Sequence, residues 1–184
     1  MEIYRPTVVS VVYRRLLQEP AELQYAMVHK PNWDASEWGL IQGAFEVDKD
    51  STFRDTARRE PREELGTQLF GMVLDTGISI RRRFSEVTCR RYPSQGYVGK
   101  EVSYFGIEFL GTEEDVHLNP ELDQLRFVGR EELLETIKYA HEAPPILSII
   151  EQHVLQGETS GSVYVSGIHS NIGCRREIQI PSGK

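Results

Sequence analysis

The segment from Thr52 to Gly66 carries the strongest helix signal in the chain, and strand-like segments lie on both sides of it. Thr52 can cap the helix, Asp55 suits its first turn three residues later, and Gly66 follows as a stop. Strands that precede, surround and follow a helix imply an α/β fold in which helices pack on a mixed β-sheet.

Segments rich in β-branched and aromatic residues are expected to supply the strands of this sheet. Residues 6–15 are expected to form a central strand, and residues 23–30 its antiparallel partner. Turn-forming residues fill positions 31–39, and a short strand or extended loop is expected over 40–47. Further strands are expected at 72–82, 85–91, 102–110 and 122–128.

Two more helices are expected at residues 130–142 and 144–156, where apolar residues recur at helical spacing. Two consecutive prolines separate them and begin the second helix. Residues 1–156 are therefore expected to form one domain, which is long enough to bury a core. Residues 157–184 are enriched in Gly and Ser and are expected to be a C-terminal extension, either loosely ordered or folded as an added hairpin.

The composition is that of an ordinary globular protein, with no apolar run near the roughly 20 residues that a membrane span needs. The N-terminus does not resemble a secretory signal. Cys89 and Cys174 lack a metal-type spacing and are expected to be free thiols in a reducing cytosol, so we expect a cytoplasmic protein without membrane contact. The net charge of −7 argues against a general nucleic-acid coat. A polyanionic substrate would need a divalent cation or a local basic cluster to offset this charge.

Glu60, Glu63 and Glu64 lie at positions i, i+3 and i+4, so a helix projects their carboxylates from one face. Like charges at this spacing destabilise a bare helix by some tenths of a kcal/mol per pair. Mg²⁺ and Mn²⁺ prefer carboxylates together with waters and phosphate oxygens, and a helix face holds such ligands rigidly. A solvated acidic face is the simpler alternative for two adjacent glutamates alone.

The surrounding residues resemble the Nudix box, Gly-x5-Glu-x7-Arg-Glu-U-x-Glu-Glu-x-Gly-U, in which U is apolar. "WGLIQGAFE" lies upstream, where Gly43 or Ala44 fills the first glycine position of the box if the loop has an insertion, and Gly43 is also a candidate substrate contact. Five residues match the helical part of the pattern: Arg59, Glu60, Glu63, Glu64 and Gly66. The resemblance implies the Nudix fold, an α/β/α sandwich around a mixed β-sheet. It also implies Mg²⁺- or Mn²⁺-dependent hydrolysis of a diphosphate linkage, usually in a nucleoside diphosphate joined to another group.

The box departs from the family pattern in its loop and in its helix interior. The first glutamate of the pattern falls on Ser51 in a loop one or two residues too long, and Asp48 and Asp50 are candidates to replace it. Pro61 stands at an apolar U position. A proline there costs about 3 kcal/mol and removes the hydrogen bond to the carbonyl of Ala57, so we expect a kink.

Carried over residue by residue, the resemblance assigns roles to the box. Glu63 and Glu64 become the first candidates for metal ligands, and Glu60 becomes a third ligand or a catalytic base. Arg59 would steer a neighbouring carboxylate. The implied chemistry is attack of water on phosphorus, in which the metal lowers the pKa of bound water and a nearby carboxylate takes the proton.

Residues 99–155 resemble the second half of the Nudix diadenosine tetraphosphate hydrolases. In this resemblance Lys100 matches a polyphosphate-contacting position and Tyr104 a base-contacting position. Glu121 matches an extra carboxylate that serves as ligand or base. The alternatives are a solvated side chain for Lys100, core packing for Tyr104, and a helix or turn cap for Glu121.

Two further substrate contacts are candidates outside the box. Trp38 lies in the preceding loop, where an aromatic ring can stack on a base, and core packing is its alternative. One basic cluster comprises Arg81, Arg82, Arg83, Arg90 and Arg91. Alternate side chains of a strand face opposite sides, so half of them, with Arg82 as our candidate, can face a polyphosphate or an RNA backbone. A solvated sheet edge is the alternative.

A nucleoside polyphosphate is therefore the expected partner, with a dinucleoside tetraphosphate as lead substrate. The chain also resembles dihydroneopterin triphosphate pyrophosphatases, and it shares W-x-x-x-Q-G with RNA 5′-pyrophosphohydrolases, so these substrates stay open. No other nucleic-acid contact is expected, and a homodimer is left open. A degenerate Nudix domain that binds without turnover is the rival hypothesis, which Ser51 and Pro61 favour.

Overall fold

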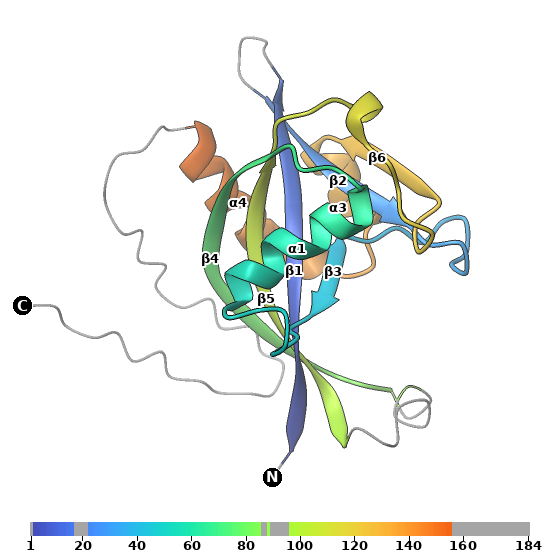
Figure 1. The fold of residues 1–184 in the computed structure, drawn as a ribbon, viewed down its shortest axis with the longest axis vertical. Coiled ribbons are helices and arrows are strands. Elements are labelled where there is room, and N and C mark those ends of the chain that lie inside the picture. The colour runs from blue at the N-terminus through green and yellow to red at the C-terminus, as the bar shows by residue number, and fades with distance from the viewer. Residues whose placement is uncertain (1, 17–21, 86–87, 89–95, 156–184) are drawn as a thin grey trace, which may run out of the picture.

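The computed structural model describes residues 2–16, 22–85, 88 and 96–155. In this part of the chain, a six-stranded sheet has the order β4-β5-β1-β2-β6, with β3 also paired to β1 (Figure 1). The strands are β1 (Ile3–Leu16), β2 (Glu22–His29), β3 (Ile41–Ala44), β4 (Phe70–Arg83), β5 (Tyr97–Phe109) and β6 (Gln124–Val128). The α-helices are α1 (Phe53–Leu65), α3 (Arg130–Thr136) and α4 (Ala143–Leu155), with 3-10 turns at Glu113–Asp115 and Ala140–Glu142.

β1 lies in the middle of the sheet, as its β-branched sequence predicts. It pairs in parallel with β5 and antiparallel with β2 and β3, which makes the sheet mixed. β5 follows one edge of β1, so β2 and β3 share the other edge. The register of β3 sets Gly43 opposite Val8, and this pairing fixes where the loop before α1 begins.

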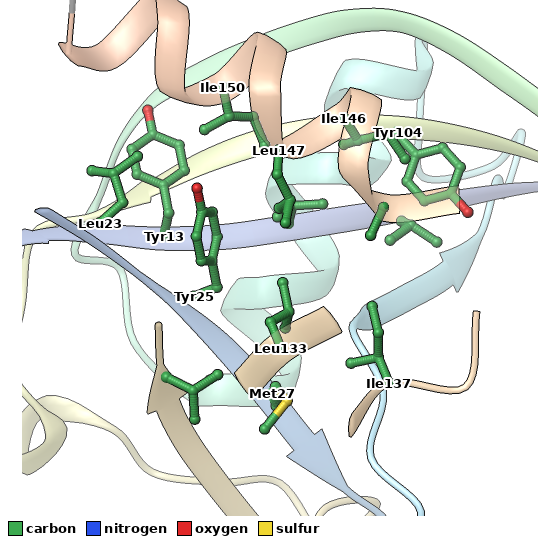
Figure 2. Packing of buried hydrophobic residues seen from close by; sticks show 14 of the residues in the cluster. Tyr13, Leu23, Tyr25, Met27, Tyr104, Leu133, Ile137, Ile146, Leu147 and Ile150 are labelled. Atoms are coloured by element: carbon green, nitrogen blue, oxygen red, sulfur yellow. The ribbon is translucent and has the colours of Figure 1, made fainter. Parts of the chain in front are cut away.

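Helices cover both faces of the sheet. α1 packs over one core, which includes Val8, Val12 and Phe105. α3 and α4 pack over the other core, which includes Tyr13 and Tyr104 (Figure 2). Alternate residues of β1 and β5 serve the two cores, because successive side chains of a strand point to opposite faces. The α/β/α sandwich expected from the resemblance is therefore confirmed.

The expected helix at 130–142 is wrong in its length. α3 ends at Thr136, and Ile137 adopts extended backbone angles and forms a parallel bridge with Trp38. Ile137 is buried in the core beneath α3 and α4, so this tertiary contact outweighs the helical spacing of the sequence. The chain then forms the 3-10 turn and continues into α4, which begins one residue before the expected position 144.

With one exception, the other expected strands are present, and β4 and β5 are longer than predicted. The strand expected at 85–91 is not found in its described residues, because Ser85 has no regular structure and Thr88 is helical; its other residues, like the extension at 157–184, lie outside the described part of the chain. The boundary between the domain and this extension stays a prediction. Among the residues that the structure describes, no helix is long and apolar enough to cross a membrane.

Candidate active site

α1 begins and ends where the sequence predicts. The Asp55 N–H donates to Thr52 Oγ1 at 3.3 Å, and the Asp55 carboxylate accepts from the Thr52 N–H at 2.8 Å, which forms a capping box. Gly66 ends the helix in the left-handed conformation with φ of 60°. A Cβ at this position would lie 2.1 Å from the carbonyl oxygen of His117, so both the backbone and the available space require glycine.

Pro61 lies inside α1, and the helix continues through it to Leu65. Because proline has no N–H, the Ala57 carbonyl loses its helical donor. Ser10 of β1 replaces this donor, since its Oγ donates to the Ala57 carbonyl oxygen at 3.0 Å and both residues are buried. The proline that departs from the box pattern is thereby accommodated by the central strand.

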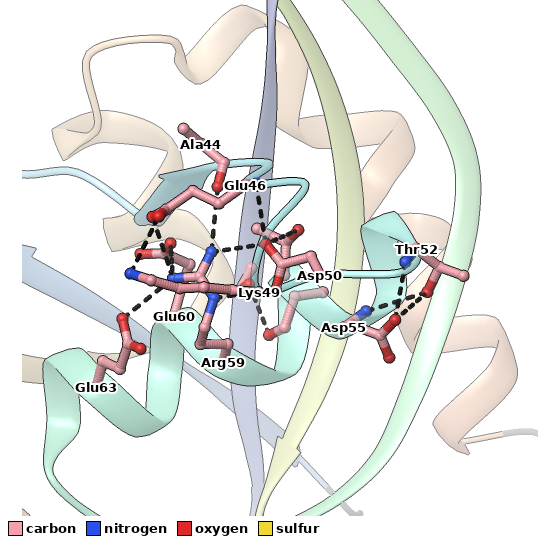
Figure 3. Close-up of polar contacts among 12 residues, drawn as sticks. Ala44, Glu46, Lys49, Asp50, Thr52, Asp55, Arg59, Glu60 and Glu63 are labelled. Carbon is pink, nitrogen blue, oxygen red and sulfur yellow. Dashed lines mark hydrogen bonds and ion pairs between the residues drawn. The ribbon is translucent and has the colours of Figure 1, made fainter.

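Arg59 lies at the centre of a network of carboxylates in front of α1 (Figure 3). Its Nε and Nη2 donate to the two carboxylate oxygens of Asp50 at 3.0 and 2.8 Å. Its Nη1 donates to Glu60 at 2.7 Å and to Glu63 at 3.1 Å. Asp50 and the other acidic neighbours raise the pKa of Arg59 above its ordinary value. Arg59 therefore steers several neighbouring carboxylates at once.

Asp50, one of the two aspartates considered as a replacement at Ser51, is bound to Arg59 by two hydrogen bonds. Its buried side chain also accepts from Thr56 Oγ1 at 2.9 Å and from the Glu46 N–H at 3.1 Å. The hydrogen bonds from Arg59 hold the pKa of Asp50 at about 2. Of the two candidate aspartates in the loop, this one therefore pairs with the arginine.

Gly43 lies against the carboxylate of Glu60. A Cβ at Gly43 would come 1.7 Å from Glu60 Cδ, so any side chain there would displace the carboxylate. Glu60 is thus held between the backbone of β3 and Arg59. Burial raises the pKa of Glu60, and the positive charge of Arg59 opposes that shift.

Glu64 is the most buried carboxylate of α1, with 4% of its surface exposed. Its Oε2 has no hydrogen-bond partner among the described residues. Burial raises its pKa to about 7; Lys30 opposes the shift, and Glu60 and Glu121 add to it. An unpartnered buried carboxylate oxygen is costly, so this atom is suited to a bound cation.

The end of α1 fixes the loop that carries Glu121. The backbone N–H groups of His117 and Asn119 donate to the carbonyls of Leu65 and Glu64 at 2.9 and 3.0 Å. Asn119 Oδ1 then accepts from the Glu121 N–H at 3.0 Å. Glu121 lies in this turn with 72% of its side chain exposed, and the loop brings it to the same end of α1 as Glu64.

Lys30 is a member of the site that sequence reasoning missed. It directly follows β2, and its Nζ lies 3.8 Å from Glu64 Oε1 and 3.6 Å from Glu121 Oε2. Its place at the end of a strand is the only sequence signal for a role in the site, because its partners Glu64 and Glu121 are distant along the chain.

The donor set fits a divalent cation, although the carboxylates now pair with cationic side chains. In the described part of the chain, no group of three or more His, Cys, Asp or Glu side chains is arranged to hold a metal ion. The available donors are nevertheless carboxylate oxygens, the kind that Mg²⁺ and Mn²⁺ prefer, and one of them lacks a partner. The ligand set expected from the resemblance, Glu60, Glu63, Glu64 and Glu121, stays a prediction.

Arg82 and Tyr104 belong to a separate network on the α4 face of the sheet. Arg82 Nε donates to Glu142 Oε1 at 2.9 Å, and its Nη2 donates to the Tyr104 hydroxyl. That hydroxyl donates to Glu142 Oε2 at 2.5 Å. The guanidinium of Arg82 also stacks on the ring of Tyr139, with 3.7 Å from Cζ to the ring centroid. Both predicted substrate residues are therefore bound to protein partners, and Tyr104, which is 3% exposed, packs in the core as its alternative interpretation expected.

The structure places Lys100 and Trp38 in different surroundings. Lys100 lies between Arg5 and Arg82 across three neighbouring strands, and burial, followed by these two charges, lowers its pKa. Trp38 is 5% exposed and packs in the core, with Arg126 stacked on its ring at 4.5 Å. Of the two interpretations left open for Trp38, the structure shows core packing.

The fold and the acidic helix define a NUDIX protein. A family model described as NUDIX domain matches residues 4–148, so the chain belongs to this family. The membership supports a hydrolase that acts on anhydrides in phosphorus-containing compounds, as the sequence predicts. A comparison with curated proteins gave no match.

Solved structures share the fold at low sequence identity. The E. coli dihydroneopterin triphosphate pyrophosphohydrolase is 16% identical with a TM-score of 0.60, over 85% of this chain and 100% of its own. A C. elegans Ap4A hydrolase in a binary complex is 16% identical with a TM-score of 0.56, over 79% of this chain and 95% of its own. The NUDIX domain of Shewanella oneidensis NrtR, complexed with ADP ribose, is 14% identical with a TM-score of 0.56, over 83% of this chain and 87% of its own.

Proposed function

We propose that this chain is a cytoplasmic pyrophosphohydrolase that uses Mg²⁺ or Mn²⁺ to cleave a phosphoanhydride bond in a nucleoside polyphosphate. The lead substrate is a dinucleoside tetraphosphate. The observation that carries the proposal is Glu64, a buried carboxylate with an unpartnered oxygen on the helix of the NUDIX box. A carboxylate in this state is suited to receive a cation.

Each acidic side chain has a role in this proposal. Glu60, Glu63, Glu64 and Glu121 would hold the ion, which when bound lowers the pKa of a coordinated water and polarises phosphoryl oxygens. Arg59 orients Glu60 and Glu63 through Nη1. Glu121 is the carboxylate most open to solvent in this group, so it is suited to accept the proton of the attacking water, with Glu60 as the alternative base.

The substrate class follows from charge and from the solved relatives. Lys100 of β5 and its neighbour Arg5 of β1 bring two positive charges together, and these would bind polyphosphate oxygens. Tyr104 and Arg82 would take part once Glu142 releases them. Similarity to the Ap4A hydrolase and to the dihydroneopterin triphosphate pyrophosphohydrolase supports a substrate with a phosphoanhydride bond.

A binding domain without turnover is the second candidate function. Arg59 already pairs with two of the box glutamates, and among the relatives a NUDIX domain was solved with ADP ribose bound. An RNA 5′ triphosphate stays a third candidate ligand, and a homodimer stays a prediction.

A substrate panel separates turnover from binding. Phosphate, pyrophosphate and nucleotide release would be measured from Ap4A, dihydroneopterin triphosphate, ADP ribose and 5′-triphosphorylated RNA, with Mg²⁺ or Mn²⁺. We expect release from a polyphosphate, with Glu63→Gln much slower and the exposed Glu131→Gln unchanged. No release from any substrate would favour the binding domain, and equal rates would remove Glu63 from the mechanism.

A further inference from the structure

We infer that Lys30 is an internal counter-cation of the carboxylate site, which neutralises Glu64 and Glu121 without a divalent ion and binds a substrate phosphate once such an ion is present. This inference rests on the proposed function, and it assigns a role to a residue outside the NUDIX box.

The first argument is the position of the ammonium group. Its two carboxylate contacts, at 3.8 and 3.6 Å, exceed hydrogen-bond length, so charge holds it there without a fixed donor geometry. The group carries three rotatable donors, and the Lys30 side chain is 24% exposed. Lys30 can therefore change partners without breaking an oriented hydrogen bond to either glutamate.

The second argument is competition for the same oxygens. Glu64 is buried, and its Oε1 lies 3.8 Å from Lys30 Nζ, which also lies 3.6 Å from Glu121 Oε2. A divalent ion held by Glu64 and Glu121 would meet the ammonium within a few ångströms. Like charges at this distance repel strongly where water is scarce. Binding of the ion would therefore displace Nζ from the carboxylates.

The third argument is that only the side chain needs to move. The preceding residue, His29, is fixed at both ring nitrogens, because Nδ1 lies 2.6 Å from Asp123 Oδ1 and Nε2 donates to the Asp34 carbonyl at 3.1 Å. The Asp123 N–H also donates to the His29 carbonyl at 3.1 Å. The backbone at Lys30 is thus held while its four-carbon stem stays able to turn.

The fourth argument is the charge that lies beyond Lys30. The ammonium is close enough to add to the electrostatic effects on Lys100, which lies beside Arg5 on the neighbouring strand. The charge of Lys30 therefore acts on the carboxylates Glu64 and Glu121 and also on Lys100. A phosphate between these two groups would receive donors from Lys30.

The experiment measures two affinities of Lys30→Met, which keeps an apolar stem and removes the charge. Calorimetric titration of the nucleotide-free protein with Mn²⁺ should show roughly two- to fivefold tighter binding, the range expected when one partly exposed charge pair is removed. With Mn²⁺ saturating, a methylene-bridged ATP analogue should bind at least threefold more weakly. Lys138→Met is the matched control, because Lys138 lies 3.5 Å from Glu37 and is 66% exposed; both affinities should stay at the wild-type values.

The two changes have opposite signs, so a general loss of folding cannot produce them, and thermal unfolding confirms that each variant is folded. Unchanged or weaker Mn²⁺ binding by Lys30→Met, or unchanged nucleotide binding, overturns the inference. If Lys30→Met gives one of these results while the wild type binds Mn²⁺ and Glu64→Gln does not, the inference falls but the proposed function survives. If the wild type binds no Mn²⁺ even with nucleotide, the proposed function and the inference both fall.

Discussion

The hydrogen bond from Ser10 to the Ala57 carbonyl predicts a measurable coupling between Ser10 and Pro61. Pro61 removes the helical donor of this carbonyl, and Ser10 Oγ replaces it at 3.0 Å in a fully buried setting. Ser10→Ala therefore leaves a buried acceptor without a partner. This change should cost about 1–3 kcal/mol of unfolding free energy, the penalty for a buried unsatisfied group.

The same substitution should cost less once the helix has its own donor. In Pro61→Ala, the new N–H at position 61 donates to the Ala57 carbonyl, so Ser10→Ala should then cost less than about 1 kcal/mol. The coupling energy of the double-mutant cycle is therefore about 1–2 kcal/mol. Pro61→Ala alone also loses the packing of a buried ring, but this loss cancels in the cycle.

Equilibrium unfolding in urea, followed by circular dichroism in EDTA, measures all four proteins. Ser79→Ala on β4 is the matched control, because Ser79 is exposed and its loss should change the unfolding free energy by less than about 0.5 kcal/mol. Additive effects of Ser10→Ala and Pro61→Ala would refute the reasoning, since the serine would then not replace the missing donor.

Two further predictions concern the carboxylates. Gly43→Ala should displace the Glu60 carboxylate and lower kcat by about 10- to 100-fold while the protein stays folded. Steady-state kinetics measures kcat, and circular dichroism checks the fold. A variant with the wild-type kcat would contradict this prediction. Because the pKa of Glu64 is raised to about 7 in the folded protein, protonation of this group contributes stability that is fully present below about pH 4.5 and is lost as the pH rises through about 7. Without metal, the wild type should therefore lose up to about 3 kcal/mol across this range relative to Glu64→Gln; urea midpoints measured against pH test this, and parallel curves would contradict it.

Local signals in the sequence predict much of the fold. The cap at Thr52, the stop at Gly66 and the β-branched run of β1 act within a few residues, and the structure places all three as expected. The acidic face of α1 also follows from spacing, because helix geometry alone brings Glu60 and Glu64 together.

Contacts between distant residues account for what the sequence does not reveal. The end of α3 at Thr136 depends on the bridge between Ile137 and Trp38, which periodicity does not encode. Lys30 reaches the site only because the sheet and the loop after α1 bring it to Glu64. The engagement of predicted substrate residues by Glu142 likewise depends on how the 3-10 turn meets β4.

The central claim is that the acidic helix holds a divalent ion for hydrolysis of a phosphoanhydride. The most direct measurement is the rate of Ap4A hydrolysis by the wild type and by Glu64→Gln, each with Mn²⁺ and with EDTA. The account predicts turnover by the wild type that EDTA abolishes, and a rate at least about 100-fold lower for Glu64→Gln. Equal rates for the two proteins, or wild-type turnover that persists in EDTA, would contradict it.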